Sequence, residues 1–137
     1  MDDVLALTRA MDLRPPASET EIAIAEQTLG AKLPLDYVEF LRLHDGGEGP
    51  VGAEGWARFI PVEKLSEENR QCSELDHLKG FLVFGTNGAD EAFVFNDAGE
   101  VLVVPWIGGR EDAIPQGRFA AFVRRLADGL LFQRDQA

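Results

Sequence analysis

The sequence is poor in the residues that carry covalent and metal chemistry. It has one cysteine, Cys72, and two histidines, His44 and His77. A single cysteine excludes an intrachain disulfide and a zinc site built from thiolates. No apolar run approaches the roughly 18 residues of a membrane-spanning helix, and the acidic start Met1-Asp2-Asp3 lacks the basic region of a secretory signal. We therefore predict a cytoplasmic protein without metal, cofactor or membrane contact.

Basic residues are also scarce. Thirteen Lys and Arg stand against 24 Asp and Glu, and the formal net charge is −11. Because nucleic-acid binding depends on clustered Lys and Arg, nucleic acid is not an expected partner. Between residues 81 and 117 the only base, Arg110, accompanies the acids Asp90, Glu91, Asp97, Glu100, Glu111 and Asp112. A field of one sign can steer an oppositely charged partner, although many acidic surfaces only keep a protein in solution.

Catalytic motifs are missing from the chain. No Gly-x-Ser-x-Gly occurs, and neither histidine belongs to a local nucleophile motif. We expect His44 to be a hydrogen-bonded core residue on the apolar side of a helix, and His77 to be exposed. The segment 85–88 lacks the Gly-Lys-Ser/Thr ending of a phosphate-binding loop, so it is predicted to be a turn. The protein is therefore predicted not to be an enzyme.

Helical patterns occupy the two ends of the chain. A short helix is expected over residues 3–11, and Ser18-Glu19-Thr20-Glu21 has the order of a capping box before a helix that ends at Gly30. A third helix should run from Pro34 to the glycines at 46 and 47 and pack on the second as a helical hairpin. The C-terminal part carries an apolar helical stripe of Phe119, Phe122, Val123, Leu126 and Leu130.

The middle of the chain has the composition of β-strands. Residues 56–62 predict a first strand, 81–84 a buried strand, and 92–95 with 101–104 a hairpin around the turn 96–99. Phe93 and Phe95 should share one face, and Phe95 and Trp106 are expected to be structural. The segment 63–78 fits either a surface helix or irregular structure, and 107–117 is predicted to be a loop. Together these patterns predict one domain over residues 1–137 with an α+β fold, in which N-terminal helices and a C-terminal amphipathic helix flank a mainly antiparallel sheet.

Four segments occur in the order of a known family. They are Leu33-Pro34-x-Asp36-Tyr37-x-x-Phe40-Leu41 leading to Asp45-Gly46-Gly47, a Phe-Ile-Pro-Val strand, Phe84-Gly85-Thr86-Asn87-Gly88 followed by 91–95, and a terminal Phe-x-x-Phe helix. Over about residues 18–130 the chain resembles the SUKH superfamily, in the branch named after the fungal Smi/Knr cell-wall-synthesis regulators. The resemblance implies helices packed on an antiparallel sheet. For a compact bacterial-type member it implies a non-catalytic immunity protein that binds and neutralises a toxin, frequently a nuclease.

An acidic protein can occupy the basic cleft of a nuclease in competition with nucleic acid. We therefore expect a basic toxin domain as the partner, bound by acids in turns and loops: Asp45, Glu48, Glu54, Asp90, Glu91, Asp97, Glu111 and Asp112. For each of them an ordinary solvated role stays open. The alternative for the whole protein is a housekeeping regulatory or scaffold module with an endogenous partner. Neither the identity of the partner nor the oligomeric state follows from the sequence.

Overall fold

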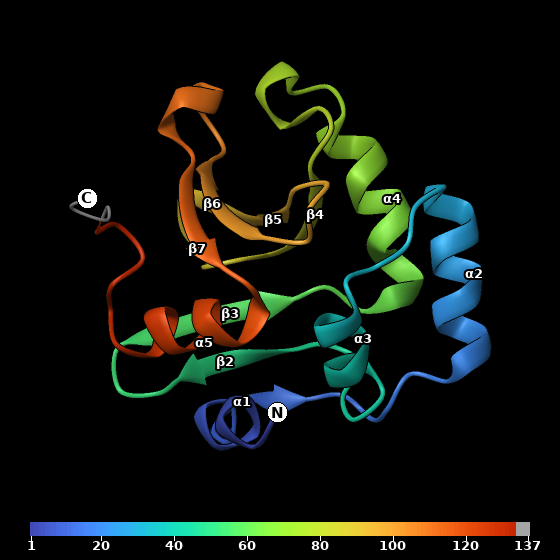
Figure 1. Cartoon of the computed structure of the whole chain (residues 1–137), viewed down its shortest axis with the longest axis vertical. Coiled ribbons are helices and arrows are strands. Elements are labelled where there is room, and N and C mark those ends of the chain that lie inside the picture. The colour runs from blue at the N-terminus through green and yellow to red at the C-terminus, as the bar shows by residue number, and fades with distance from the viewer. Residues whose placement is uncertain (134–137) are drawn as a thin grey trace.

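The structure, a computed structural model, describes residues 1–133, and its centre is a seven-stranded antiparallel sheet whose spatial order equals the chain order (Figure 1). The strands are β1 (Asp12–Leu13), β2 (Gly47–Val51), β3 (Gly55–Phe59), β4 (Leu82–Thr86), β5 (Glu91–Phe95), β6 (Val101–Pro105) and β7 (Ile114–Gly117). The helices are α1 (Asp2–Leu7), α2 (Glu19–Leu29), α3 (Leu35–Leu41), α4 (Val62–Cys72) and α5 (Phe119–Ala127), with 3-10 turns η1 (Asp76–Leu78) and η2 (Arg110–Asp112). The predicted α+β class is confirmed.

The capping box and the hairpin form where the sequence predicts them. The Ser18 hydroxyl accepts from the Glu21 N–H at 3.0 Å, and the Glu21 carboxylate accepts from the Ser18 N–H at 3.0 Å. These bonds lower the pKa of Glu21, and Gly30 ends α2 with a φ of 72°. Strands β5 and β6 pair in register around the predicted turn. Local side-chain and backbone chemistry is therefore sufficient for these two elements.

An aromatic core lies between the sheet, α3 and α5. Phe122 of α5 packs edge-on against Phe93 of β5, with ring centroids 4.8 Å apart. Phe84 of β4 stacks on Phe95 at 4.2 Å, and Phe93 lies on the same side of the sheet, as predicted. The helix α3 adds Tyr37, whose ring lies 5.1 Å from that of Phe84. All five rings are at most 2 % exposed, so burial of aromatic surface contributes to holding helices and sheet together.

Three N-terminal predictions were wrong. The first helix ends at Leu7, because Asp12 and Leu13 pair with β2 as a strand. The third helix ends at Leu41, and β2 follows from Gly47 in a glycine-rich segment without an alternating apolar pattern. The helices α2 and α3 do not form a hairpin, since α2 packs along α4 (Figure 1). In each case the partner that decides the structure is distant in sequence.

The segment 63–78 contains a helix, and the segment 107–117, predicted to be a loop, contains a strand. The first part of the segment 63–78 is helical and belongs to α4. The Asn69 amide of this helix donates to the Val83 carbonyl and accepts from the Val83 N–H, both at 2.8 Å. The pairing of β3 with β4 ends where the Ile60 N–H donates to the Phe84 carbonyl. Beyond that point the Asn69 side chain bonds to the backbone of β4, as a neighbouring strand would. The predicted loop 107–117 contains η2 and β7, which pairs with β6.

Candidate functional site

Two acids of the segment 33–47 hold the first turns of distant helices. The Asp36 carboxylate accepts from the backbone N–H of Phe119 in α5 at 3.1 Å. The Asp45 carboxylate accepts from the N–H of Val62 in α4 at 2.9 Å. Neither helix receives a side-chain cap from the residue that precedes it. The two aspartates therefore cap α5 and α4 from outside, which satisfies backbone donors that would otherwise lack a partner.

Asp45 is therefore no longer a candidate for contact with a partner. Its side chain lies beneath the start of α4, and the residue is only 5 % exposed. The expectation that it contributes to a partner surface is corrected, because its carboxylate is already used inside the fold. Burial raises the pKa of Asp45, while the hydrogen bond from Val62 opposes that shift.

Two substitutions of Asp45 test its role as the cap of α4. Asp45→Ala should destabilise the protein by about 1–2 kcal/mol, because the Val62 N–H loses its acceptor. Asp45→Asn keeps an acceptor oxygen and removes the buried charge. Since the folded pKa lies above the ordinary value of 3.8, the wild type should lose stability as the pH rises from that value through the folded pKa.

The Asp45→Asn variant should escape this loss. Its stability relative to the wild type should therefore increase through the same pH window and then level off. Urea unfolding of wild type and both variants, from acidic to neutral pH, measures this difference. A relative stability of Asp45→Asn that falls as the pH rises would contradict the assignment.

Five of the other candidate acids lie at one end of the sheet, which we call the acidic edge. It consists of Glu54 in the β2–β3 turn, Asp90 and Glu91 where β5 begins, and Glu111 and Asp112 in η2. Antiparallel pairing brings these segments together, because the β4–β5 turn and the connection after β6 lie at the same end of the strands. The sequence predicted these acids individually, and the meander places them on one side.

Hydrogen bonds connect the segments of the acidic edge. The Asp90 carbonyl accepts from the Trp106 N–H at 2.9 Å, which holds the start of β5 against the end of β6. The Glu91 carboxylate accepts from the Asn87 side chain at 2.7 Å, and Asn87 lines a hollow together with Glu54. These contacts join the start of β5 to the end of β6 and place Asn87, the partner of Glu91, beside Glu54.

None of the five carboxylates forms an ion pair with a lysine or arginine within residues 1–133. The nearest base in sequence, Arg110, is directed elsewhere. Its guanidinium donates to the carbonyls of His77 at 3.3 Å and Lys79 at 2.5 Å, and it lies 4.0 Å from the centre of the Phe81 ring. The described bases thus leave the negative charge of the acidic edge unpaired.

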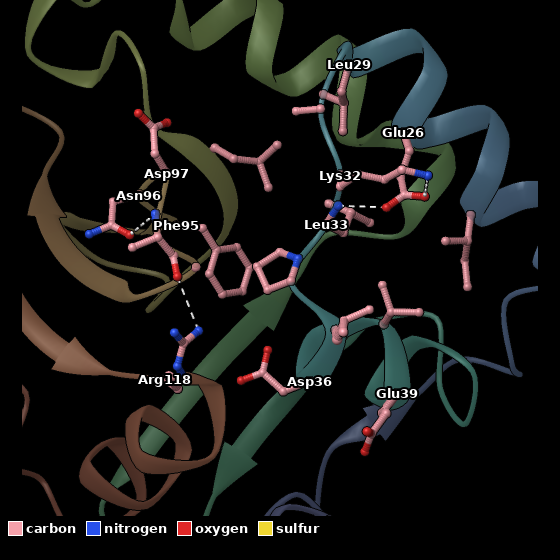
Figure 2. Close-up of a pocket in the computed structure, with 18 of the residues that line it drawn as sticks. Glu26, Leu29, Lys32, Leu33, Asp36, Glu39, Phe95, Asn96, Asp97 and Arg118 are labelled. Atoms are coloured by element: carbon pink, nitrogen blue, oxygen red, sulfur yellow. Dashed lines mark hydrogen bonds and ion pairs between the residues drawn. The ribbon is translucent and has the colours of Figure 1, made fainter.

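The two remaining candidate acids lie apart from this edge. Glu48 on β2 stands between Asp12 of β1 and Arg58 of β3. Asp97 occupies the β5–β6 turn, at the opposite end of the strands, close to the connection between α2 and α3 (Figure 2). Of the eight predicted contact residues, the structure therefore places five at the same end of the strands, buries one and locates two elsewhere.

A groove of about 1230 Å³ lies beside Asp97, and the sequence analysis did not find it. One wall is the β5–β6 turn, and the facing wall is the α2–α3 connection with Lys32 and Leu33 (Figure 2). Much of its charge is internally paired, since the Glu26 carboxylate contacts the Lys32 amine at 3.8 Å and accepts from the Leu33 N–H at 2.7 Å. The walls come from distant segments, so no local sequence pattern indicated this surface. Leu35, which lines it, is 82 % exposed.

The side chains that could take part in catalysis lie outside the acidic edge and outside the groove beside Asp97. Burial raises the pKa of Tyr37 and of Cys72. His77 is half-buried, not exposed as predicted, and its Nε2 lies 2.7 Å from the Pro105 carbonyl. His44 follows the end of α3, with Nδ1 3.3 Å from the Arg14 carbonyl. Within residues 1–133 no three His, Cys, Asp or Glu side chains are grouped to hold a metal.

The helices of the described chain are also too short or too polar to cross a membrane.

Comparison with known proteins gives the same relationship as the sequence motifs. The profile of the family described as SMI1 / KNR4 family (SUKH-1) matches residues 16–126. A relative described as "Uncharacterized protein YnaB", from Bacillus subtilis (strain 168), is 34% identical over 107 residues, which are 74% of this chain and 69% of the relative. The matched region contains α2 to β7 and all but the end of α5. The chain therefore belongs to the SMI1 / KNR4 family (SUKH-1).

Proposed function

We propose that this protein is an immunity-type binding protein that neutralises a basic toxin domain, of the nuclease type, by covering it with the acidic edge. The observation that carries the proposal is the position of five carboxylates at the same end of the sheet without an ion pair to a described base. Family membership supports it, since compact SUKH proteins of the bacterial type are expected to bind toxins.

Charge complementarity explains why such an edge suits a nuclease. A cleft that binds phosphates presents clustered Lys and Arg, and carboxylates fixed by a rigid sheet can pair with the same cations. Unpaired exposed acids also raise the rate of encounter with a basic protein, and salt weakens this steering. Binding should therefore be fast and sensitive to ionic strength.

Inhibition by occupation of a cleft needs no catalytic step in the inhibitor. The side chains that could act as nucleophiles are poorly placed for chemistry, because burial favours the neutral forms of Cys72 and Tyr37. Neither residue lines the groove or the hollow beside Glu54. The proposal is accordingly a binding function without catalysis.

The test is co-expression with the toxin domain encoded next to the gene, scored for rescue of growth, followed by titration of the purified pair. Reversing four edge acids (E54K, D90K, E111K and D112K) should weaken binding at low salt by about tenfold or more. Glu91 stays unchanged, because its carboxylate holds Asn87. The matched control, E48K with D97K, reverses exposed acids outside the edge and should leave most of the affinity.

A complex that binds equally tightly at low salt after the four reversals would refute the role of the acidic edge. A toxin that is neither bound nor neutralised would refute the immunity function. In that case the housekeeping regulatory or scaffold module, with an endogenous protein partner, becomes the preferred explanation.

A further inference from the structure

A hollow of about 340 Å³ lies at the Glu54 end of the acidic edge. Its lining residues come from the β2–β3 turn and the start of β3 on one side, and from the end of α5 with the chain after it on the other. Figure 1 shows these two segments side by side. The lining residues are Glu54, Gly55, Trp56, Asn87, Leu126, Gly129, Leu131 and Phe132. The hollow thus combines one carboxylate, one amide, two aliphatic side chains and two aromatic rings.

The two aromatic rings of this hollow are exposed, unlike the rings of the core. Trp56 is 39 % exposed and Phe132 is 57 % exposed, whereas the phenylalanines of the core are at most 2 % exposed. Trp56 is also held in position, because its ring lies against Gly88, where an added Cβ would come within 2.6 Å of it. A fixed, exposed tryptophan beside unpaired acids has the character of an anchor point in a protein interface.

We propose that this hollow is the socket for an arginine side chain of the basic partner. The guanidinium would stack on the rings of Trp56 and Phe132 and pair with the Glu54 carboxylate. The aliphatic part of the arginine would pack against Leu126 and Leu131. The inference rests on the proposed function for the positive charge of the partner, and it adds which side chain the protein recognises and where.

Charge and polarity select this occupant over others. The Glu54 carboxylate and the neighbouring edge acids repel an anionic group. A purely aliphatic side chain would take water from Glu54 without replacing its hydrogen bonds, which costs free energy. Lysine could pair with Glu54, but its compact ammonium lacks the planar face that stacks on two rings.

The test uses the whole protein, labelled with ¹⁵N, and the peptide Ac-Gly-Arg-Gly-Arg-Gly-NH2 as the probe. Its matched partner carries citrulline in place of both arginines, which keeps the shape and removes the charge. NMR titration should show a saturable shift of the Trp56 indole N–H. The indole of Trp106, whose backbone N–H donates to Asp90 in the acidic edge, lies outside the hollow and should shift less. The citrulline peptide should bind about fivefold more weakly or not at all.

Variants separate the socket from general attraction to acids. Glu54→Gln and Phe132→Ala should each weaken the arginine peptide about fivefold. Phe132 follows the last helix and is exposed, so its removal should leave the fold intact. Asp97→Asn, at the opposite end of the strands, should change nothing. Equal binding of both peptides, or an equal loss in Asp97→Asn, would overturn the proposal.

The outcomes distinguish failure of the arginine socket from failure of the immunity function. Neutralisation of a toxin without a saturable Trp56 shift would refute the socket alone. A specific arginine socket without neutralisation of a toxin would refute the proposed function and leave the recognition chemistry standing.

Discussion

Replacement of Phe119 by alanine should destabilise the protein by about 3–5 kcal/mol, which is the usual cost of removing a fully buried phenylalanine. The Phe119 side chain is 0 % exposed. Its ring centroid lies 5.2 Å from that of Tyr37, 5.4 Å from Phe40 and 5.9 Å from Phe59. The cavity would therefore open where α3, α5 and the sheet meet, and the rings around it cannot all collapse into it.

Because small domains are stable by about 5–15 kcal/mol, this loss should remove a large share of the free energy of unfolding. Urea or thermal unfolding followed by circular dichroism measures the change. Phe132→Ala is the matched control, since it makes the same chemical change at a side chain that is 57 % exposed. Its free energy of unfolding should stay within about 0.5 kcal/mol of the wild type. Similar losses for the two variants would contradict the position of the core.

Gly46→Ala should destabilise the protein by about 2–5 kcal/mol. Gly46 has a φ of 78°, a conformation that costs an L-residue about 1–2 kcal/mol. An added Cβ would also lie 2.5 Å from the backbone carbonyl oxygen of Phe59. Backbone atoms of a central strand cannot move aside easily, and such overpacking typically adds about 1–3 kcal/mol.

Gly80→Ala separates the two contributions. Gly80 has a similar φ of 84°, but no atom lies within 4 Å of the position of an added Cβ. This control should therefore lose only the conformational part, about 1–2 kcal/mol. Chemical denaturation of both variants gives the difference, which measures the steric contact of Gly46 with β3. Equal losses would show that the contact is relieved without cost.

The segment 33–47 illustrates what sequence reasoning can recognise without explaining. Its motif indicated the family and predicted a helix that begins at Pro34. The same reasoning assigned Asp36 to the first turn of that helix and Asp45 to a partner surface. The structure confirms Asp36 in the first turn of α3 and adds that its carboxylate caps α5 at Phe119. The Asp45 carboxylate instead caps α4 at Val62. No local pattern contains this information, because the bonded N–H groups belong to elements that meet only in the folded chain.

For the acidic edge, too, the sequence shows which acids are present, and the fold decides where they lie. The excess of acids between residues 81 and 117, and their location in turns, could be read directly from the sequence. Which of them share a surface depends on the direction of each strand, since successive antiparallel turns alternate between the two ends of a sheet. Asp90 and Asp97 are close in sequence but lie at opposite ends of β5. Trp56, in the predicted strand 56–62, is 39 % exposed, although a strand tryptophan usually packs in a core.

The sequence by itself determined the elements whose stabilising contacts are local: the capped helix α2, the amphipathic helix α5, the β5–β6 hairpin and hence the α+β class. Only the tertiary structure decided the strands β1, β2 and β7, the packing of α2 on α4, the roles of Asp36 and Asp45, and the gathering of the acidic edge. The physical reason is the range of the interactions. Capping boxes and turns are completed within a few residues, whereas β-ladders and distant helix caps need partners that the folded chain alone brings within hydrogen-bonding distance.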